Sequence, residues 1–382
     1  MAKKAYVGIS NVAQQSKKIY VGVSGVARKV KKGYIGVNGV ARLFFQSDLK
    51  LVYYKNYYST TGRYPNTCSG YNGKYGFIGG SSTNNHTTDI LAIDKSFTIT
   101  TPTVLNARPS DSAQLEQYVF FAPSSSSGSI PFDYYNQSQT HSSVSVTTTN
   151  NRTYALLYND NYVVMFPTEN SGYSGTLVYL LNASLTVSSV SVSGTFHHGG
   201  MYCTTTNGVY GMLYGGRDSS YSSSGYNYFS VNYCEAVDTS GTVTKVTDMS
   251  ELYGSLGVRA GDYALIIGGE YQNTATNRNY DSYEVYAFDQ SLTKTSAPSI
   301  SMPVNTWVWS QKSAASAGEY GIASTMRSLQ SGYSQKYEAY NKSLTQQVFA
   351  TEDKIRYAGV TVTEGAVFAS SYTTGWDAFK LE

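Results

Sequence analysis

The sequence predicts an all-β chain in which short repeated β-hairpins precede a large ring of four-stranded sheets. Three observations lead to this prediction: the composition, a 14-residue repeat in the first 46 residues, and a longer repeat over the rest of the chain. Tyrosine fills 37 of 382 positions while charged residues make up only 14 %, and aromatic and β-branched residues favour strands. We therefore expect almost no helix. A helical bundle or coiled coil is excluded, and membrane insertion is not expected because no run reaches about 18 apolar residues.

The first 46 residues contain one unit three times. Its copies are AYVGISNVA at 5–13, IYVGVSGVAR at 19–28 and GYIGVNGVAR at 33–42, each preceded by a pair of lysines. Each copy has a short apolar strand, a two-residue Ser-Asn, Ser-Gly or Asn-Gly turn, and a return strand. Asn-Gly favours the type I′ turn because both of its positions need positive φ. The period therefore predicts three consecutive β-hairpins.

These hairpins carry an unusual charge. Residues 1–46 hold nine Lys/Arg and no acidic residue, whereas 47–382 hold nineteen Lys/Arg and 25 Asp/Glu. A flexible basic linker would need no period, and a nucleic-acid-binding segment would be expected to interleave aromatics or match a known module. One hairpin alone is marginal in water. We therefore expect residues 1–46 to be an attachment and oligomerisation module that forms a homotrimer or docks to another protein, without binding nucleic acid.

The YVGV-NG-VARKVKK repeat resembles the N-terminal segment of tail-associated virion proteins encoded by phages and prophages of anaerobic Gram-positive bacteria. The resemblance covers about the first 45 residues. It implies attachment to a phage tail or baseplate through residues 1–46. The start at Met1 lacks the apolar region of a signal peptide. We therefore expect a virion protein made in the host cytoplasm that acts outside the cell.

Residues 47–382 contain the second repeat. An apolar strand, ending in Gly-Gly in the clearest copies, is followed by a polar loop, a Tyr-rich strand and an Asp/Asn-x-Ser-Leu/Phe-Thr motif. The copies start at 75, 118, 162, 210, 263, 320 and 366. These spacings match the ~40–50-residue blades of β-propellers. The paired glycines resemble kelch repeats, although most copies lack the tryptophan usual in that family. A kelch-like β-propeller of seven blades is favoured, with six as the alternative.

The ends of this region predict how the ring closes. The last copy stops about one strand short of a full blade, while Leu49–Tyr54 is a strand-like segment ahead of the first blade. Unpaired sheet edges are a liability that closed folds remove. We therefore expect the segment around Leu49–Tyr54 to pair with the strand near Phe379.

The segments after the Gly-Gly strands are expected to be loops on one face of the propeller. They are long and rich in Tyr, Asn and Ser, the composition that paratopes use. Tyrosine offers a flat apolar face and a hydroxyl, which suits a sugar ring. The alternative is that these loops only solvate the β-surface. The candidate ligand-binding residues are Tyr221, Tyr226, Tyr228, Tyr271, Asn277, Arg278 and Tyr280.

Motifs for enzymatic chemistry are scarce. The sequence has no Walker loop, GxSxG or CxxC motif and no sialidase-type Asp box. Cys68, Cys203 and Cys234 are an odd number and are expected to be buried free thiols. We therefore assign no catalytic, cofactor-binding or metal-binding residue and regard an enzyme as the less favoured interpretation. The expected function is a phage tail or baseplate receptor-binding protein that recognises a host-surface glycan or protein; the alternatives are a glycan-degrading propeller enzyme and a purely structural virion protein.

Overall fold

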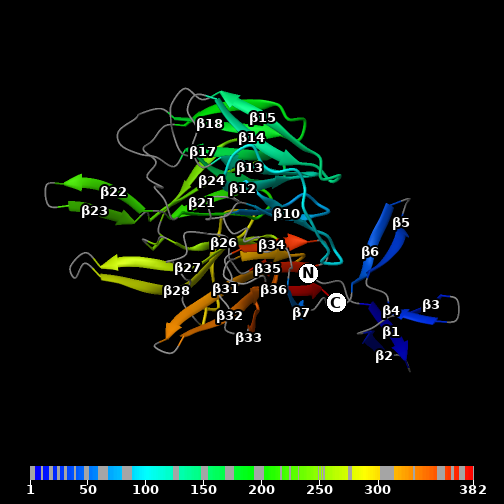
Figure 1. Cartoon of the computed structure of the whole chain (residues 1–382). Helices are drawn as coiled ribbons and strands as arrows, with labels where there is room; N and C mark the ends of the chain where they lie inside the picture. Colours follow the sequence, from blue (N-terminus) through cyan, green and yellow to red (C-terminus); the bar gives the residue numbers. More distant parts are fainter. Residues whose placement is uncertain are drawn as a thin grey trace. The chain divides into compact units, whose positions relative to one another are not determined.

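The structure is a computed structural model of the 382-residue chain (Figure 1). It describes residues 5–9, 12–16, 20–23, 26–29, 32–37, 40–46, 51–58, 68–79, 88–123, 129–147, 154–167, 176–192, 202–215, 217–222, 225–230, 232–247, 249–250, 252, 254–273, 278–301, 314–329, 332–350, 358–362, 365–369 and 375–381. Within these ranges the regular structure is all β-strand, so no helix there is long and apolar enough to cross a membrane. The chain divides into two compact units, Met1–Lys50 with Glu382, and Leu51–Leu381.

The first unit confirms the predicted hairpins. It contains three separate two-stranded antiparallel sheets. Their strands are β1 (Ala5–Ile9) with β2 (Val12–Ser16), β3 (Tyr20–Val23) with β4 (Val26–Lys29), and β5 (Lys32–Val37) with β6 (Val40–Gln46). The pairing register repeats with the sequence, since each central glycine faces an alanine: Gly8–Ala13, Gly22–Ala27 and Gly36–Ala41.

The second unit consists of seven four-stranded antiparallel sheets, the blades of a β-propeller. Blade 1 is β8 (Cys68–Tyr71), β9 (Gly76–Gly79), β10 (Ile90–Ile93) and β11 (Ile99–Thr100). Blade 2 is β12 (Pro109–Leu115), β13 (Tyr118–Pro123), β14 (Ser129–Tyr135) and β15 (His141–Thr147). Blade 3 is β16 (Tyr154–Tyr158), β17 (Tyr162–Pro167), β18 (Thr176–Asn182) and β19 (Val187–Val192). Blade 4 is β20 (Tyr202–Thr206), β21 (Gly211–Gly215), β24 (Cys234–Val237) and β25 (Val243–Val246).

The remaining three blades complete the ring. Blade 5 is β26 (Leu256–Ala260), β27 (Tyr263–Asn273), β28 (Arg278–Phe288) and β29 (Lys294–Ala297). Blade 6 is β30 (Ala314–Ala317), β31 (Tyr320–Leu329), β32 (Gly332–Tyr340) and β33 (Gln346–Ala350). Blade 7 is β34 (Ala358–Val362), β35 (Gly365–Ala369), β36 (Gly375–Leu381) and β7 (Leu51–Tyr58). The first strand of each blade contacts the first strand of the next, and β34 returns to β8. The ring therefore has seven blades, as favoured from the sequence, and its repeat starts mark the second strand of each blade.

The predicted closure is also confirmed. Strand β7 pairs with β36 and places Tyr53 opposite Phe379, whose rings meet edge to face at 5.5 Å. The Asp377 carboxylate is buried beside this pair and accepts hydrogen bonds from the hydroxyls of Tyr53 (3.3 Å) and Tyr337 (2.8 Å). Blade 7 thus combines strands from both ends of the unit, which removes two sheet edges.

Six blades share one turn between their third and fourth strands. An Asp or Asn accepts hydrogen bonds through its Oδ1 atom from the backbone N–H groups two and four residues later. The residue in between has positive φ, which is the three-residue hairpin loop with a left-handed third position. These Asx residues are Asp94, Asn136, Asn182, Asp238, Asp289 and Asn341. The sequence motif missed Asn136 and Asp238, because Gln139 and Gly241 replace the expected Leu or Phe.

Buried asparagines connect neighbouring blades at the same end of the ring. Asn72, Asn159 and Asn207 each lie in the turn between the first and second strands of a blade, and each is at most 2 % exposed. The Nδ2 group of Asn72 donates to the Asn136 carbonyl of blade 2 at 2.7 Å. The Nδ2 groups of Asn159 and Asn207 donate in the same way to the Asp238 and Asp289 carbonyls, at 2.9 and 2.7 Å. Each asparagine therefore joins its own blade to the Asx turn of the next.

The hydrophobic core lies between the faces of adjacent blades. Phe77 of blade 1 stacks on Tyr135 of blade 2 with ring centroids 5.1 Å apart. The Tyr135 hydroxyl donates to the Thr103 carbonyl in the segment that connects these two blades. Aromatic rings with one polar atom suit this position because they fill the interface and also bind the connecting backbone.

Candidate functional site

Three neighbouring blades carry long hairpins on one face of the propeller. This is the face of the connections between second and third strands. In blade 4 the connection contains an additional hairpin of β22 (Arg217–Ser222) and β23 (Gly225–Ser230); in blades 5 and 6 the strand pairs β27–β28 and β31–β32 themselves continue outward. Figure 1 shows all three pointing away from the ring on the same side. We call them the blade-4 hairpin (217–230), the blade-5 hairpin (269–282) and the blade-6 hairpin (326–335).

The expectation that these segments are loops was wrong for most of their length, because they are strands. In blade 5 the Gly-Gly pair does not end β27 but lies within it. Gly268 and Gly269 have φ of 58° and 121°, and the pairing register shifts between Ile267 and Gly269. Such a bulge is accessible to glycine, and it lets the strand leave the blade while still paired.

The backbone brings most of the sequence-predicted residues onto two adjacent hairpins. In the blade-4 hairpin Tyr221 pairs with Tyr226, and Tyr228 pairs with Ser219. In the blade-5 hairpin Tyr271 pairs with Tyr280, and Arg278 pairs with Asn273. Asn277 lies outside the described residues. The blade-6 hairpin, in which Tyr333 pairs with Ser328, contains none of the sequence-predicted residues.

The best-defined feature of this face is a pair of tyrosines. Tyr271 and Tyr280 are 42 % and 40 % exposed, and their rings stack with centroids 5.5 Å apart and an angle of 20° between planes. Directly paired residues of antiparallel strands share one face, and the next pair takes the other. The pair Glu270–Asp281 therefore lies on the opposite face of the hairpin from the tyrosines.

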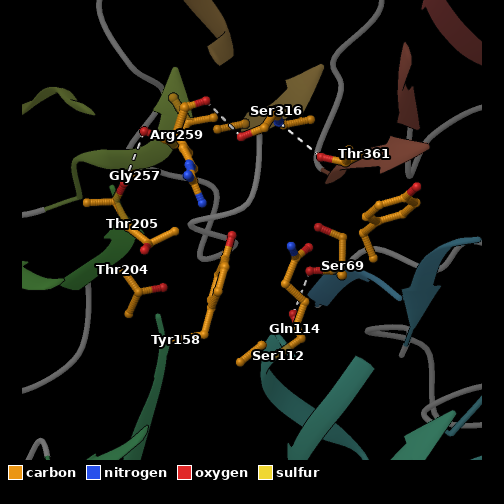
Figure 2. A pocket seen from close by; sticks show the side chains of 17 residues that line it. Ser69, Ser112, Gln114, Tyr158, Thr204, Thr205, Gly257, Arg259, Ser316 and Thr361 are labelled. Atoms are coloured by element: carbon orange, nitrogen blue, oxygen red, sulfur yellow. Dashed lines mark hydrogen bonds between the residues drawn. The ribbon is translucent and has the colours of Figure 1, made fainter. Parts of the chain in front are cut away.

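A second candidate is a cavity of about 110 Å³ in the central channel. The first strands of all seven blades line it, with Ser, Thr and Gly prominent. Figure 2 shows the side chains of Gln114, Tyr158 and Arg259 reaching toward this space. Ligand pockets usually measure about 300–1,000 Å³. The channel cavity therefore suits waters or a very small solute rather than an extended ligand.

Polar side chains around the channel connect neighbouring blades. The Ser112 hydroxyl donates to the Ser69 carbonyl at 2.5 Å, and the Thr205 hydroxyl donates to the Val258 carbonyl at 3.0 Å (Figure 2). The Ser316 hydroxyl donates to the Arg259 carbonyl at 2.8 Å. These hydroxyls have a structural role because each one satisfies a backbone carbonyl of an adjacent first strand.

Arg259 is the charged group at this cavity, and its partners belong to the turns of the ring. Its Nε–H donates to the Gly261 carbonyl at 2.8 Å, and its terminal nitrogen lies 3.5 Å from an Asp160 carboxylate oxygen. Burial raises the pKa of Tyr158, which the nearby guanidinium only partly opposes, so this phenol stays protonated. Burial, followed by the hydrogen-bonded Asp111, likewise raises the pKa of Tyr202. Both phenols can therefore act as hydrogen-bond donors.

The cysteines of blade 4 are free and buried, as predicted. In the register of the sheet, Tyr214 lies opposite both Cys203 and Cys234 on the strands to either side. Adjacent strands in a sheet lie about 4.8 Å apart. Because one strand lies between Cys203 and Cys234, the two cysteines are too far apart to form a disulfide. Among the described residues, no group of three or more His, Cys, Asp or Glu side chains could hold a metal ion.

The comparisons with known proteins define the fold. No protein-family profile matches the chain, and no curated protein matches it. Among solved structures, virginiamycin B lyase from Staphylococcus aureus is similar with a TM-score of 0.51 and 9 % identity, covering 88 % of this chain and 100 % of its own. The protein YjhT is similar with a TM-score of 0.52 and 9 % identity, covering 75 % and 97 %. At this identity the likeness shows the fold alone: a seven-bladed β-propeller.

Proposed function

We propose that the chain is a receptor-binding protein of a phage tail or baseplate, attached through residues 1–46 and contacting the host surface with the face of the three hairpins. The observation that carries this proposal is the clustering of the blade-4, blade-5 and blade-6 hairpins on one face of a closed ring. A rigid scaffold with extended polar and aromatic projections is a common design for recognition sites. The repeat resemblance of residues 1–46 supports the tail assignment.

The architecture of the N-terminal unit supports attachment through it. Each of its hairpins is a separate two-stranded sheet with two open edges, and such sheets are marginal in water. A partner that pairs with or covers them would complete the structure. A phage tail protein, or two further copies of this chain in a homotrimer, would provide that cover.

The test uses the full chain labelled with a fluorophore and a panel of anaerobic Gram-positive strains. The matched variant replaces residues 270–281 with Asn-Gly, a two-residue turn that closes the blade-5 strands after the Gly269–Ser282 pair. We expect the wild-type chain to bind a subset of strains and the shortened chain to bind these at least tenfold more weakly, with an unchanged melting temperature. Failure of the wild-type chain to bind any strain or to block phage adsorption would contradict the proposal.

An enzyme is the second candidate, because one solved structure of this fold is by its name a lyase. Incubation of the chain with the same host strains distinguishes an enzyme from an adhesin. Release of reducing ends or unsaturated products from wall polysaccharide would favour a glycan-degrading propeller over an adhesin. Binding without release would support the adhesin.

A further inference from the structure

The chemical class of the receptor can be inferred from the three hairpins. We propose that they bind a neutral glycan, and that the Tyr271–Tyr280 pair is the platform on which a sugar ring lies. This inference rests on the proposed function, because it specifies the ligand of the same face. Of the two receptor classes in the proposed function, a carbohydrate is thereby favoured over a protein.

The first argument is the composition of the hairpins. Of their 38 residues, nineteen are Ser, Thr, Asn or Gln and six are Tyr. The other apolar side chains are four: Phe229, Ala275, Met326 and Leu329. The buried centre of a protein interface is enriched in apolar side chains, at about 65 % non-polar area. A sugar instead presents C–H faces edged by hydroxyls, and these require tyrosine rings together with amides and hydroxyls.

The second argument is charge. The three hairpins contain three arginines, Arg217, Arg278 and Arg327, against three acidic residues, Asp218, Glu270 and Asp281. Their formal charge is therefore zero. A receptor with a charged backbone, such as a polymer of phosphates or uronic acids, would be matched by an excess of basic residues. Balanced charge favours a neutral polymer.

The third argument is the geometry of the blade-5 hairpin. Tyr271 and Tyr280 are exposed and nearly parallel, while the acidic pair Glu270–Asp281 occupies the other face. The phenol hydroxyls of both tyrosines can donate and accept hydrogen bonds. One face therefore combines an exposed aromatic surface with phenol hydroxyls, the combination that a sugar ring and its hydroxyls need.

The test compares Tyr271→Ala and Tyr280→Ala with Tyr283→Ala in the full chain. Tyr283 is a matched control, because it is 41 % exposed on the same strand but lies at the register shift, outside the blade-5 hairpin. The probe is the neutral polysaccharide fraction of host cell walls, immobilised for kinetic binding. We expect about a fivefold loss of affinity for each variant of the pair, as for loss of one aromatic contact, and no loss for Tyr283→Ala. Binding should change little between low and high salt.

Treated host cells separate this inference from the proposed function. Periodate treatment, which destroys sugars, should abolish binding, and protease treatment should not. Binding that is lost to protease and survives periodate would establish a protein receptor. Binding that falls steeply with salt would establish a charged polymer. Either result overturns the neutral-glycan inference while leaving the receptor-binding proposal standing. Loss of affinity equal in Tyr283→Ala and Tyr271→Ala would overturn the platform.

Discussion

Tyr54 of blade 7 stacks on Phe97 of blade 1, with ring centroids 5.4 Å apart and 28° between the ring planes. Tyr54 is the extra residue of a β-bulge, since Ala378 pairs with Lys55 and Phe379 with Tyr53. Phe97 is the positive-φ residue of its Asx turn, and the Lys380 ammonium lies 4.1 Å from the Tyr54 ring. The bulge therefore adds a contact across the seam where the ring closes, beyond the strand pairing itself.

This seam predicts different effects for two truncations. Removal of residues 1–58 deletes β7, exposes β36 as an edge and removes Tyr53 from the buried Asp377. We expect this chain to unfold at a much lower temperature or to aggregate, because an open ring presents long unpaired edges. Removal of residues 1–46 should leave the melting transition of the propeller nearly unchanged. Calorimetry of both truncations checks this, and equal losses would contradict the role of β7.

The sequence predicted the second strands well and the first strands poorly, for a physical reason. Second strands such as Tyr162–Pro167 are buried on both faces and form apolar runs that repeat visibly. First strands line the channel, where small polar residues make cross-blade hydrogen bonds. Tyr202–Thr206 has the sequence YCTTT and shows no hydrophobic period. The number of blades could therefore be predicted from the second strands alone, but the first strands that line the channel could not be predicted.

The buried asparagines between blades predict a measurable stability loss. The Asn72 Oδ1 atom accepts from the backbone N–H groups of Lys74 (3.1 Å) and Tyr75 (2.8 Å), while its Nδ2 group binds blade 2. Asn72→Ala would lose three hydrogen bonds in a buried site, which we expect to cost about 2–3 kcal/mol. Urea unfolding measures this loss. Asn161→Ala is the control, because its single bond to the Thr239 carbonyl is exposed and should contribute well under about 1 kcal/mol.

The Asx turn of Asp238 predicts that the free energy of unfolding depends on pH in the acidic range. Burial opposes ionisation of Asp238, but hydrogen bonds from Ser240, Thr242 and Gly241 outweigh it and lower the pKa of the carboxyl below its ordinary value. Folding therefore favours the carboxylate. Its contribution is present above pH about 4, where the unfolded group ionises, and is lost as pH falls through the lower folded pKa.

The substitution Asp238→Asn isolates this contribution. Asn136, Asn182 and Asn341 make the same turn without a charge, so the variant should keep the turn. We expect near-native stability at neutral pH and a smaller loss of stability on acidification than in the wild type. The free energy of unfolding of both proteins is measured at several pH values between 7 and about 3. An equal loss in the two proteins over this range would contradict a role for this carboxylate.

The candidate site shows a different limit of sequence analysis. Tyr271 and Tyr280 were both singled out, but their pairing depends on a bulge between Ile267 and Gly269 that shifts the register by one residue. A one-residue shift moves every side chain to the other face. The blade-6 hairpin was missed because its copy of the repeat has Thr325-Met326 where the clearest copies have Gly-Gly.

The buried thiols of blade 4 should be inert in the folded protein. Burial raises the pKa of Cys203, and burial together with the adjacent Glu235 raises that of Cys234. The thiolate is the reactive form, so both should resist alkylation. Mass spectrometry after iodoacetamide treatment at pH 8 should find these two cysteines unmodified in native protein and modified in denaturant. Rapid modification of either thiol in the native state would contradict the packing of blade 4.

The closest backbone approach in the channel gives a last prediction. A Cβ atom on Gly257 would lie 2.1 Å from the Thr204 carbonyl oxygen, whereas one on Gly70 would lie 2.4 Å from a methyl carbon of Val119. Both alanine substitutions should destabilise the propeller, but only the second clash involves a side chain. Val119→Ala should therefore partly rescue Gly70→Ala, so that their combined loss is smaller than the sum of the two. Thr204→Ala leaves the carbonyl in place and should not rescue Gly257→Ala. Double-mutant cycles by urea unfolding measure both couplings, and wild-type stability of Gly257→Ala would contradict the contact between β20 and β26.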